Sequence, residues 1–355
     1  MKTLKIGNLI ARLPVIQGGM GVGISLSGLS SAVANQGGIG VISAAGIGMM
    51  EPDFYTNFFQ ANIRALKNQI RSARRQTDGI LGVNIMVAMS NFADMVKAAV
   101  EEGIDIIFAG AGLPLDLPKY LLNTIHTKIV PIVSSGKAAR VICQRWLQRY
   151  NRLPDAIVVE GPKAGGHLGF KLEQIDDPAY SLENITKDVI QEAAVLTQER
   201  GTPIPVIAAG GIYTGADIRK FLDLGASGVQ MATRFVTTNE CDASPAFKQC
   251  YIDAKEENIG IINSPVGMPG RAIINDFIRS SNAGEKKPYK CPYHCLLTCD
   301  YKNSPYCIAL ALTNAKNGNM KCGYAFAGQN AYRATGITSV KEVFKALIKE
   351  YNDIS

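Results

Sequence analysis

The stretch DAIVVEGPKAGGHLG (155–169) is an apolar run of strand length that leads into a glycine-rich loop. Similar apolar runs recur through the first 235 residues, with helical patterns between several of them. Most of these runs are apolar on both faces, as the strands of a buried parallel sheet are. Eight alternations of strand and helix match the count of a (β/α)₈ TIM barrel, and a doubly wound open sheet is the rival fold. The predicted strands are 14–17, 38–43, 80–86, 104–110, 128–135, 155–161, 205–210 and 227–232.

The rhythm stops after Phe235. We therefore predict three parts: a barrel over 1–236, a smaller inserted helical or lid domain over 237–319, and a C-terminal segment, 320–355, that returns to the barrel. In the last part, residues 338–351 carry apolar side chains at helical spacing and predict a helix with one face on the barrel.

Composition limits the function classes. The chain has 355 residues, 47% of them hydrophobic and 19% charged, which indicates a globular protein with a large core. The net charge of +7 is spread along the chain without an arginine-rich tail, so we expect no nucleic-acid partner. The N-terminus is not a secretory signal and no apolar run of 18 residues occurs, so we expect a cytoplasmic protein with no membrane partner. The expected partner is a small-molecule substrate, and a homodimer is a possible oligomeric state.

Barrel enzymes gather their chemistry at the carboxyl ends of the strands. The first run leads into Gly18-Gly19-Met20, where a flat ligand can approach the backbone. The third run ends at Asn84, an amide that needs partners if it is buried. The sixth leads to His167, inside a glycine-rich loop, and its position favours a functional role.

The seventh and eighth runs end in loops that commonly bind phosphate in barrels. Gly210, Gly211 and Thr233 are the predicted phosphate cradle. A phosphate there, with a planar ring over the first and third strands, describes FMN.

Taken together, the segments QGGMG, GVNI, EGPKAGGHLG, VIAAGGI and GVQMATRF resemble the nitronate monooxygenase family in order and spacing. That group also includes FMN-dependent enoyl-ACP reductases and some NAD(P)H:quinone reductases. The resemblance covers roughly 1–240, together with PVGMPGRAI and FAGQNAYR. It implies His167 as the catalytic residue. It also implies FMN at Gly18, Gly19, Met20, Asn84, Gly165, Gly166, Gly210, Gly211, Gln230, Met231 and Thr233.

The resemblance implies an FMN-dependent oxidoreductase, with oxidative denitrification of alkyl nitronates by O₂ as the first expectation. NAD(P)H-dependent reduction of an enoyl thioester or a quinone is the alternative, since Gly18-Gly19-Met20 looks more like the enoyl-reductase branch than the Ala-Pro-Met of well-studied nitronate oxygenases. A more remote alternative is a non-redox isomerase or aldolase that binds a phosphorylated metabolite and uses Lys163 and Glu160.

Cys291, Cys295, Cys299 and Cys307 are closely spaced. Such thiols could ligate an iron–sulfur cluster or a zinc ion, although the spacing fits neither common pattern. In a helix, the first three would form one stripe that packs a lid on the barrel. Reduced, buried thiols without metal are the favoured interpretation, a metal centre is the second, and a disulfide is the third.

Overall fold

The computed structural model describes residues 1–121, 126–285, 291 and 293–353. Eight parallel strands form one sheet in the order β3-β11-β10-β8-β7-β6-β5-β4. A parallel bridge between Ile16 and Ile39 brings the two edge strands together, so the sheet curls into a nearly closed barrel. The eight strands are β3 (Val15–Gln17), β4 (Gly40–Ser43), β5 (Leu81–Met86), β6 (Ile106–Gly110), β7 (Lys128–Val133), β8 (Ile157–Glu160), β10 (Val206–Ala209) and β11 (Gly228–Met231). Each lies within a predicted run, and the predicted (β/α)₈ fold is confirmed.

The inside of the barrel is a packed apolar core. Alternate residues of the strands, among them Val41, Phe108 and Ile207, point inward and are fully buried. Gly82 makes room for the Phe108 ring, because a Cβ there would lie 2.6 Å from the ring. An antiparallel hairpin of β1 (Leu4–Ile6) and β2 (Leu9–Ala11), which the sequence patterns did not predict, packs into the same core.

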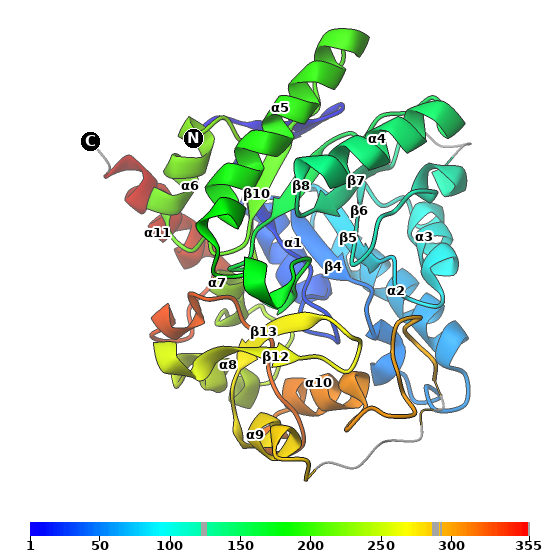
Figure 1. The fold of residues 1–355 in the computed structure, drawn as a ribbon, viewed down its shortest axis with the longest axis vertical. Coiled ribbons are helices and arrows are strands. Elements are labelled where there is room, and N and C mark those ends of the chain that lie inside the picture. Colours follow the sequence, from blue (N-terminus) through cyan, green and yellow to red (C-terminus); the bar gives the residue numbers. More distant parts are fainter. Residues whose placement is uncertain (122–125, 286–290, 292, 354–355) are drawn as a thin grey trace.

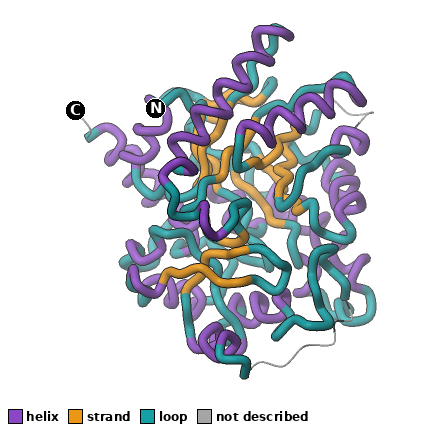
Figure 2. The backbone as a smooth tube through the Cα atoms, in the orientation of Figure 1, coloured by secondary structure: helices purple, strands orange, loops and turns teal. Residues whose placement is uncertain are grey.

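Helices surround the barrel on the outside (Figures 1 and 2). The helix predicted over 338–351 is present, and helices also lie between strands of the barrel, as the helical patterns indicated. The helices of the barrel are α1 (Ser27–Asn35), α2 (Phe58–Arg74), α3 (Phe92–Glu101), α4 (Gly136–Tyr150), α5 (Leu182–Arg200), α6 (Gly215–Asp223), α7 (Thr233–Val236) and α11 (Val340–Asn352). The two helices α6 and α11 approach closely, since a Cβ on Gly215 would lie 2.2 Å from the Leu347 carbonyl oxygen.

Between α7 and α11 the chain makes a long excursion. The chain leaves and returns at one place, where Thr238 and Thr338 form a parallel bridge. The excursion lies below the barrel in Figure 1 and contains α8 (Pro245–Ile252), α9 (Asp276–Asn282) and α10 (Ile308–Lys316). It also contains a hairpin of β12 (Ile259–Asn263) and β13 (Pro269–Ile273), so the lid is not helical alone. The domain boundaries given above remain a prediction.

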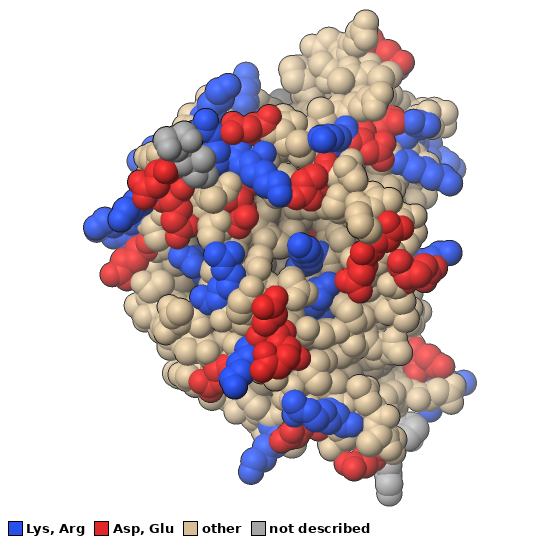
Figure 3. Space-filling view, turned by 60° about the vertical axis from the view of Figure 1, so that its left-hand side comes forward, with Lys and Arg blue, Asp and Glu red and all other residues tan. Residues whose placement is uncertain are grey.

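Basic side chains of the described surface have acidic neighbours at several places. On the face shown in Figure 3, acidic and basic side chains are interspersed. The basic side chains of α2 form ion pairs with neighbouring carboxylates, including Lys67 with Glu101 at 2.6 Å and Arg74 with Asp105 at 2.6 Å. Within the described part of the chain, no helix is both long and apolar enough to cross a membrane.

Candidate active site

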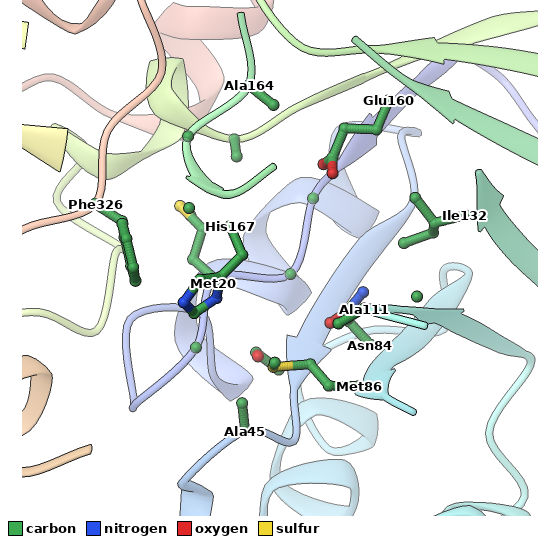
Figure 4. Close-up of a pocket in the computed structure, with 18 of the residues that line it drawn as sticks. Met20, Ala45, Asn84, Met86, Ala111, Ile132, Glu160, Ala164, His167 and Phe326 are labelled. Carbon is green, nitrogen blue, oxygen red and sulfur yellow. The ribbon is translucent and has the colours of Figure 1, made fainter. Parts of the chain in front are cut away.

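A cavity of about 620 Å³ opens at the carboxyl end of the barrel. It is lined by residues from the ends of β3, β5, β8, β10 and β11 and by parts of the excursion (Figure 4). His167 and all eleven residues predicted to bind the cofactor line this one cavity. These eleven are Gly18, Gly19, Met20, Asn84, Gly165, Gly166, Gly210, Gly211, Gln230, Met231 and Thr233.

Several of the residues that line this cavity are glycines. A Cβ on Gly19 would lie 2.5 Å from the Cβ of Asn84, and one on Gly165 would lie 2.5 Å from the backbone nitrogen of Gly328. Gly210 and Gly211 have φ values of 96° and 86°, in the left-handed region that other residues rarely adopt. These glycines therefore let neighbouring segments pack closely around the cavity, in backbone conformations that a larger residue would strain.

Polar side chains at strand ends contribute to the lining of the cavity. The Asn84 amide at the end of β5 and the Glu160 carboxyl at the end of β8 point into it (Figure 4). Burial raises the pKa of Glu160 to about 7, because the charged form loses its hydration. Among the described residues that line the cavity, none is Lys or Arg. An anionic ligand would therefore be bound chiefly by backbone amides and uncharged side chains.

His167 lies in the two-residue strand β9 (Gly166–His167), which pairs with β13. Its Nε2 forms a 2.7 Å hydrogen bond with Ser264 Oγ. The imidazole also packs edge-on against Phe326, with ring centroids 4.9 Å apart. Burial lowers the pKa of His167 to about 4, so the ring is neutral at neutral pH.

Several residues of the site were missed by sequence reasoning. Ser264 and Phe326 hold His167, but each lies far from it in sequence. The loop after Phe326 packs on the predicted phosphate loops. There, Gly328 N donates to Thr233 Oγ1 at 3.1 Å and Asn330 Nδ2 donates to the Gly211 carbonyl at 2.6 Å. The motifs PVGMPGRAI and FAGQNAYR adjoin or contain these residues, so they were the available signal.

The other candidate residues have different positions. Lys163, one half of the acid–base pair considered for a non-redox enzyme, is exposed and does not line the cavity, whereas Glu160 does. The expected helical stripe of cysteines is wrong, because no helix is present at the described residues between α9 and α10. All eight cysteines of the chain are free.

A parallel barrel with a cavity, glycine-rich loops and a half-buried histidine at its carboxyl end has the features of a barrel enzyme with its ligand site in the usual place. The chain belongs to the nitronate monooxygenase family, whose model matches residues 2–350. The resemblance found in the sequence motifs is thereby confirmed.

Known proteins of different names are similar to this chain. A probable nitronate monooxygenase of Staphylococcus saprophyticus is 24% identical over 100% of this chain and 99% of its own length. A hydroxy-methyl-oxo-octahydro-indene-carboxyl-CoA dehydrogenase of Mycobacterium tuberculosis is 29% identical over 77% of this chain, and the match spans 66% of that relative. The structure of FabK from Thermotoga maritima is 28% identical, with a TM-score of 0.74, over 96% of this chain and 93% of that one.

Proposed function

We propose that this chain is an FMN-dependent oxidoreductase that carries out the oxidative denitrification of alkyl nitronates with O₂. The observation that carries the proposal is that a glycine cradle and a neutral, half-buried histidine line the same cavity. The family match over nearly the whole chain supports it.

The residues present fit FMN. In our proposal, the amides of Gly210, Gly211 and Thr233 bind its phosphate, a task for which the cavity offers no Lys or Arg among its described residues. Gly18 and Gly19 line the cavity without a side chain, and we assign the flavin ring to this wall. Asn84 offers a donor and an acceptor to its polar edge. FMN, when bound, supplies the redox chemistry, and the protein supplies placement.

His167 is the proposed catalytic residue, and its pKa favours one form of substrate. With a pKa of about 4 it is a weak base, poorly matched to removing a proton from a neutral nitroalkane. A nitronate has already lost that proton. Against such a substrate, the imidazole would orient and hydrogen-bond the nitro group and would hold a proton beside it. We therefore favour nitronates over nitroalkanes as substrates.

A second candidate is NAD(P)H-dependent reduction of an enoyl thioester or a quinone. It is favoured by the structural similarity to FabK and by the Gly18-Gly19-Met20 motif. The same cavity would then accept an electron-poor alkene or quinone, and His167 would polarise its carbonyl.

Parallel assays separate the two candidates. The purified protein is tested on an alkyl nitronate with O₂, following nitrite release, and on NADH or NADPH with crotonyl thioester or a quinone. We expect turnover with the nitronate without a nicotinamide, and far less with the parent nitroalkane. Turnover confined to the nicotinamide-dependent assays would favour the second candidate.

The role of His167 is tested by replacement. His167→Ala should leave FMN bound in near-equal amount to protein and lower turnover by roughly 10²–10⁴-fold, the usual effect of losing a positioned acid or base. Loss of FMN with an unchanged rate per bound flavin would make His167 a structural residue instead. Protein that stays colourless after incubation with FMN would refute the cofactor assignment.

A further inference from the structure

Beside the main cavity, four cysteines surround a second hollow of about 20 Å³. It lies in the loop that precedes α10, drawn in orange in Figure 1. All four thiols are free and only partly exposed. The cysteines that line it are Cys291, Cys295, Cys299 and Cys307.

Regular secondary structure does not explain this convergence. The described residues between Asn282, the last of α9, and Ile308, the first of α10, form no helix or strand. A helical period therefore does not align the sulfurs, and the irregular path of the loop brings them together. Irregular loops of this length are uncommon inside a compact protein and are usually either functional or linker segments.

The backbone around the hollow is also arranged for sulfur. The N–H of His294 donates to Cys291 Sγ at 3.4 Å, and His294 adopts a left-handed φ of 46° that is rare for a residue other than glycine. Hydrogen bonds from backbone amides to ligand sulfurs are a regular feature of iron–sulfur sites.

We infer that Cys291, Cys295, Cys299 and Cys307 bind a [4Fe–4S] cluster. The cluster is favoured over a zinc ion because, among the described residues, no three His, Cys, Asp or Glu side chains are arranged to hold a single metal ion. In a [4Fe–4S] cluster each of four irons takes one cysteine. The four sulfurs then need to surround a volume and do not need to meet at one point.

The position of the hollow gives the cluster a structural consequence. Cys295, Leu296 and Ile308 line both the hollow and the main cavity. The same segment is attached to the loop after β5, since Ser90 N donates to the Cys295 carbonyl at 3.1 Å and Met89 forms a bridge with Leu296. A cluster bound here would fix one wall of the main cavity.

The first experiment measures the metal content of the full chain, produced with iron and sulfide available and purified without oxygen. We expect about four iron atoms and about four acid-labile sulfides per chain, with an EPR signal of a reduced cluster after dithionite treatment. Protein without iron, or with zinc in its place, would overturn the inference. These readouts do not depend on FMN or on turnover, so they are independent of the proposed function.

The second experiment locates the iron. Cys299→Ala and Cys307→Ala should lose most of it, while Cys322→Ala, which removes an exposed cysteine outside the hollow, should retain it. Far-UV circular dichroism checks that the variants fold. Iron retained by all three variants would place it elsewhere and refute the assignment. If the first two variants do not fold, the metal content of the unmodified chain decides.

Discussion

The charge state of His167 offers the most direct test of the site. The imidazole lies between Ser264 and Phe326, and loss of hydration lowers its pKa from the ordinary 6.5 to about 4. The perturbation is a change of pH from 7.5 to 5, applied to the unmodified chain and to His167→Gln, which cannot titrate. At pH 5 an ordinary histidine is almost fully protonated, whereas His167 should still be neutral.

The expected effect on stability follows from linkage. At pH 5 the unfolded state binds a proton at this residue and the folded state does not, so acid favours unfolding. With pKa values of 4 folded and 6.5 unfolded, the contribution of His167 to the free energy of unfolding falls by about 2 kcal/mol between pH 7.5 and pH 5. The contribution is complete above pH 6.5 and is lost as the pH falls from 6.5 towards 4. His167→Gln should lack this part of the pH dependence.

Nuclear magnetic resonance reads the titration itself. The chain has three histidines, so protein labelled with ¹³C at Cε1 of histidine should show three signals, and the one that disappears in His167→Gln identifies His167. We expect its midpoint near pH 4, and a smaller loss of apparent stability at pH 5 in the variant than in the unmodified chain. A midpoint near 6.5, or equal losses of stability in both proteins, would refute the burial argument and with it the preference for nitronates.

Three further predictions concern the surroundings of the site. Gly165→Ala should lower both FMN affinity and thermal stability, because the new Cβ would lie 2.5 Å from a backbone nitrogen. Gly336→Ala is the matched control, since a Cβ there would meet nothing within 4 Å. Equal behaviour of the two variants in flavin titration would contradict the close approach at Gly165. Ser264→Ala should lower kcat about tenfold with KM little changed, since the His167 imidazole loses its hydrogen-bond partner. Ser264→Thr should retain the rate. Steady-state kinetics that show only a change in KM would exclude a positioning role for Ser264. Glu160→Gln should raise the melting temperature at pH 8 and not at pH 4.5. The pKa of Glu160 is raised to about 7, so its ionisation above that pH destabilises the folded state. A higher melting temperature of the variant at pH 4.5 instead would count against a buried, neutral carboxyl.

The barrel could be predicted from sequence because its strands have a distinctive composition. Runs such as 155–161 and 205–210 are apolar on both faces, which only a sheet covered on both sides requires. The β1–β2 hairpin could not be recognised in this way. Only Leu4 and Ile6 of β1 face the core, and a three-residue strand gives too short an alternation to stand out from a charged N-terminus.

The site could be predicted only in part, for a related reason. Glycines and single polar residues at strand ends are visible because the barrel orders them along the chain. Ser264 and Phe326 reach His167 only through the pairing of β9 with β13 and the bridge from Ala272 to Phe326. Both contacts join segments that are far apart in the sequence. No local pattern encodes such pairings, so the partners of His167 required the structure.

Two parts of the chain, the barrel loops and the excursion, contribute different residues to the site. Barrel loops contribute the glycines proposed to hold a cofactor. The excursion contributes Ser264 and Phe326 beside His167, and Met268 to the cavity wall. The excursion also packs on the barrel loops through Gly328 and Asn330, so its position depends on the same loops that would bind the phosphate. In a family whose members bear different activities, substitutions in the barrel loops should therefore act mainly on cofactor binding. Substitutions in the excursion should act mainly on which substrate is accepted, because that part of the chain forms the wall beside the proposed catalytic histidine.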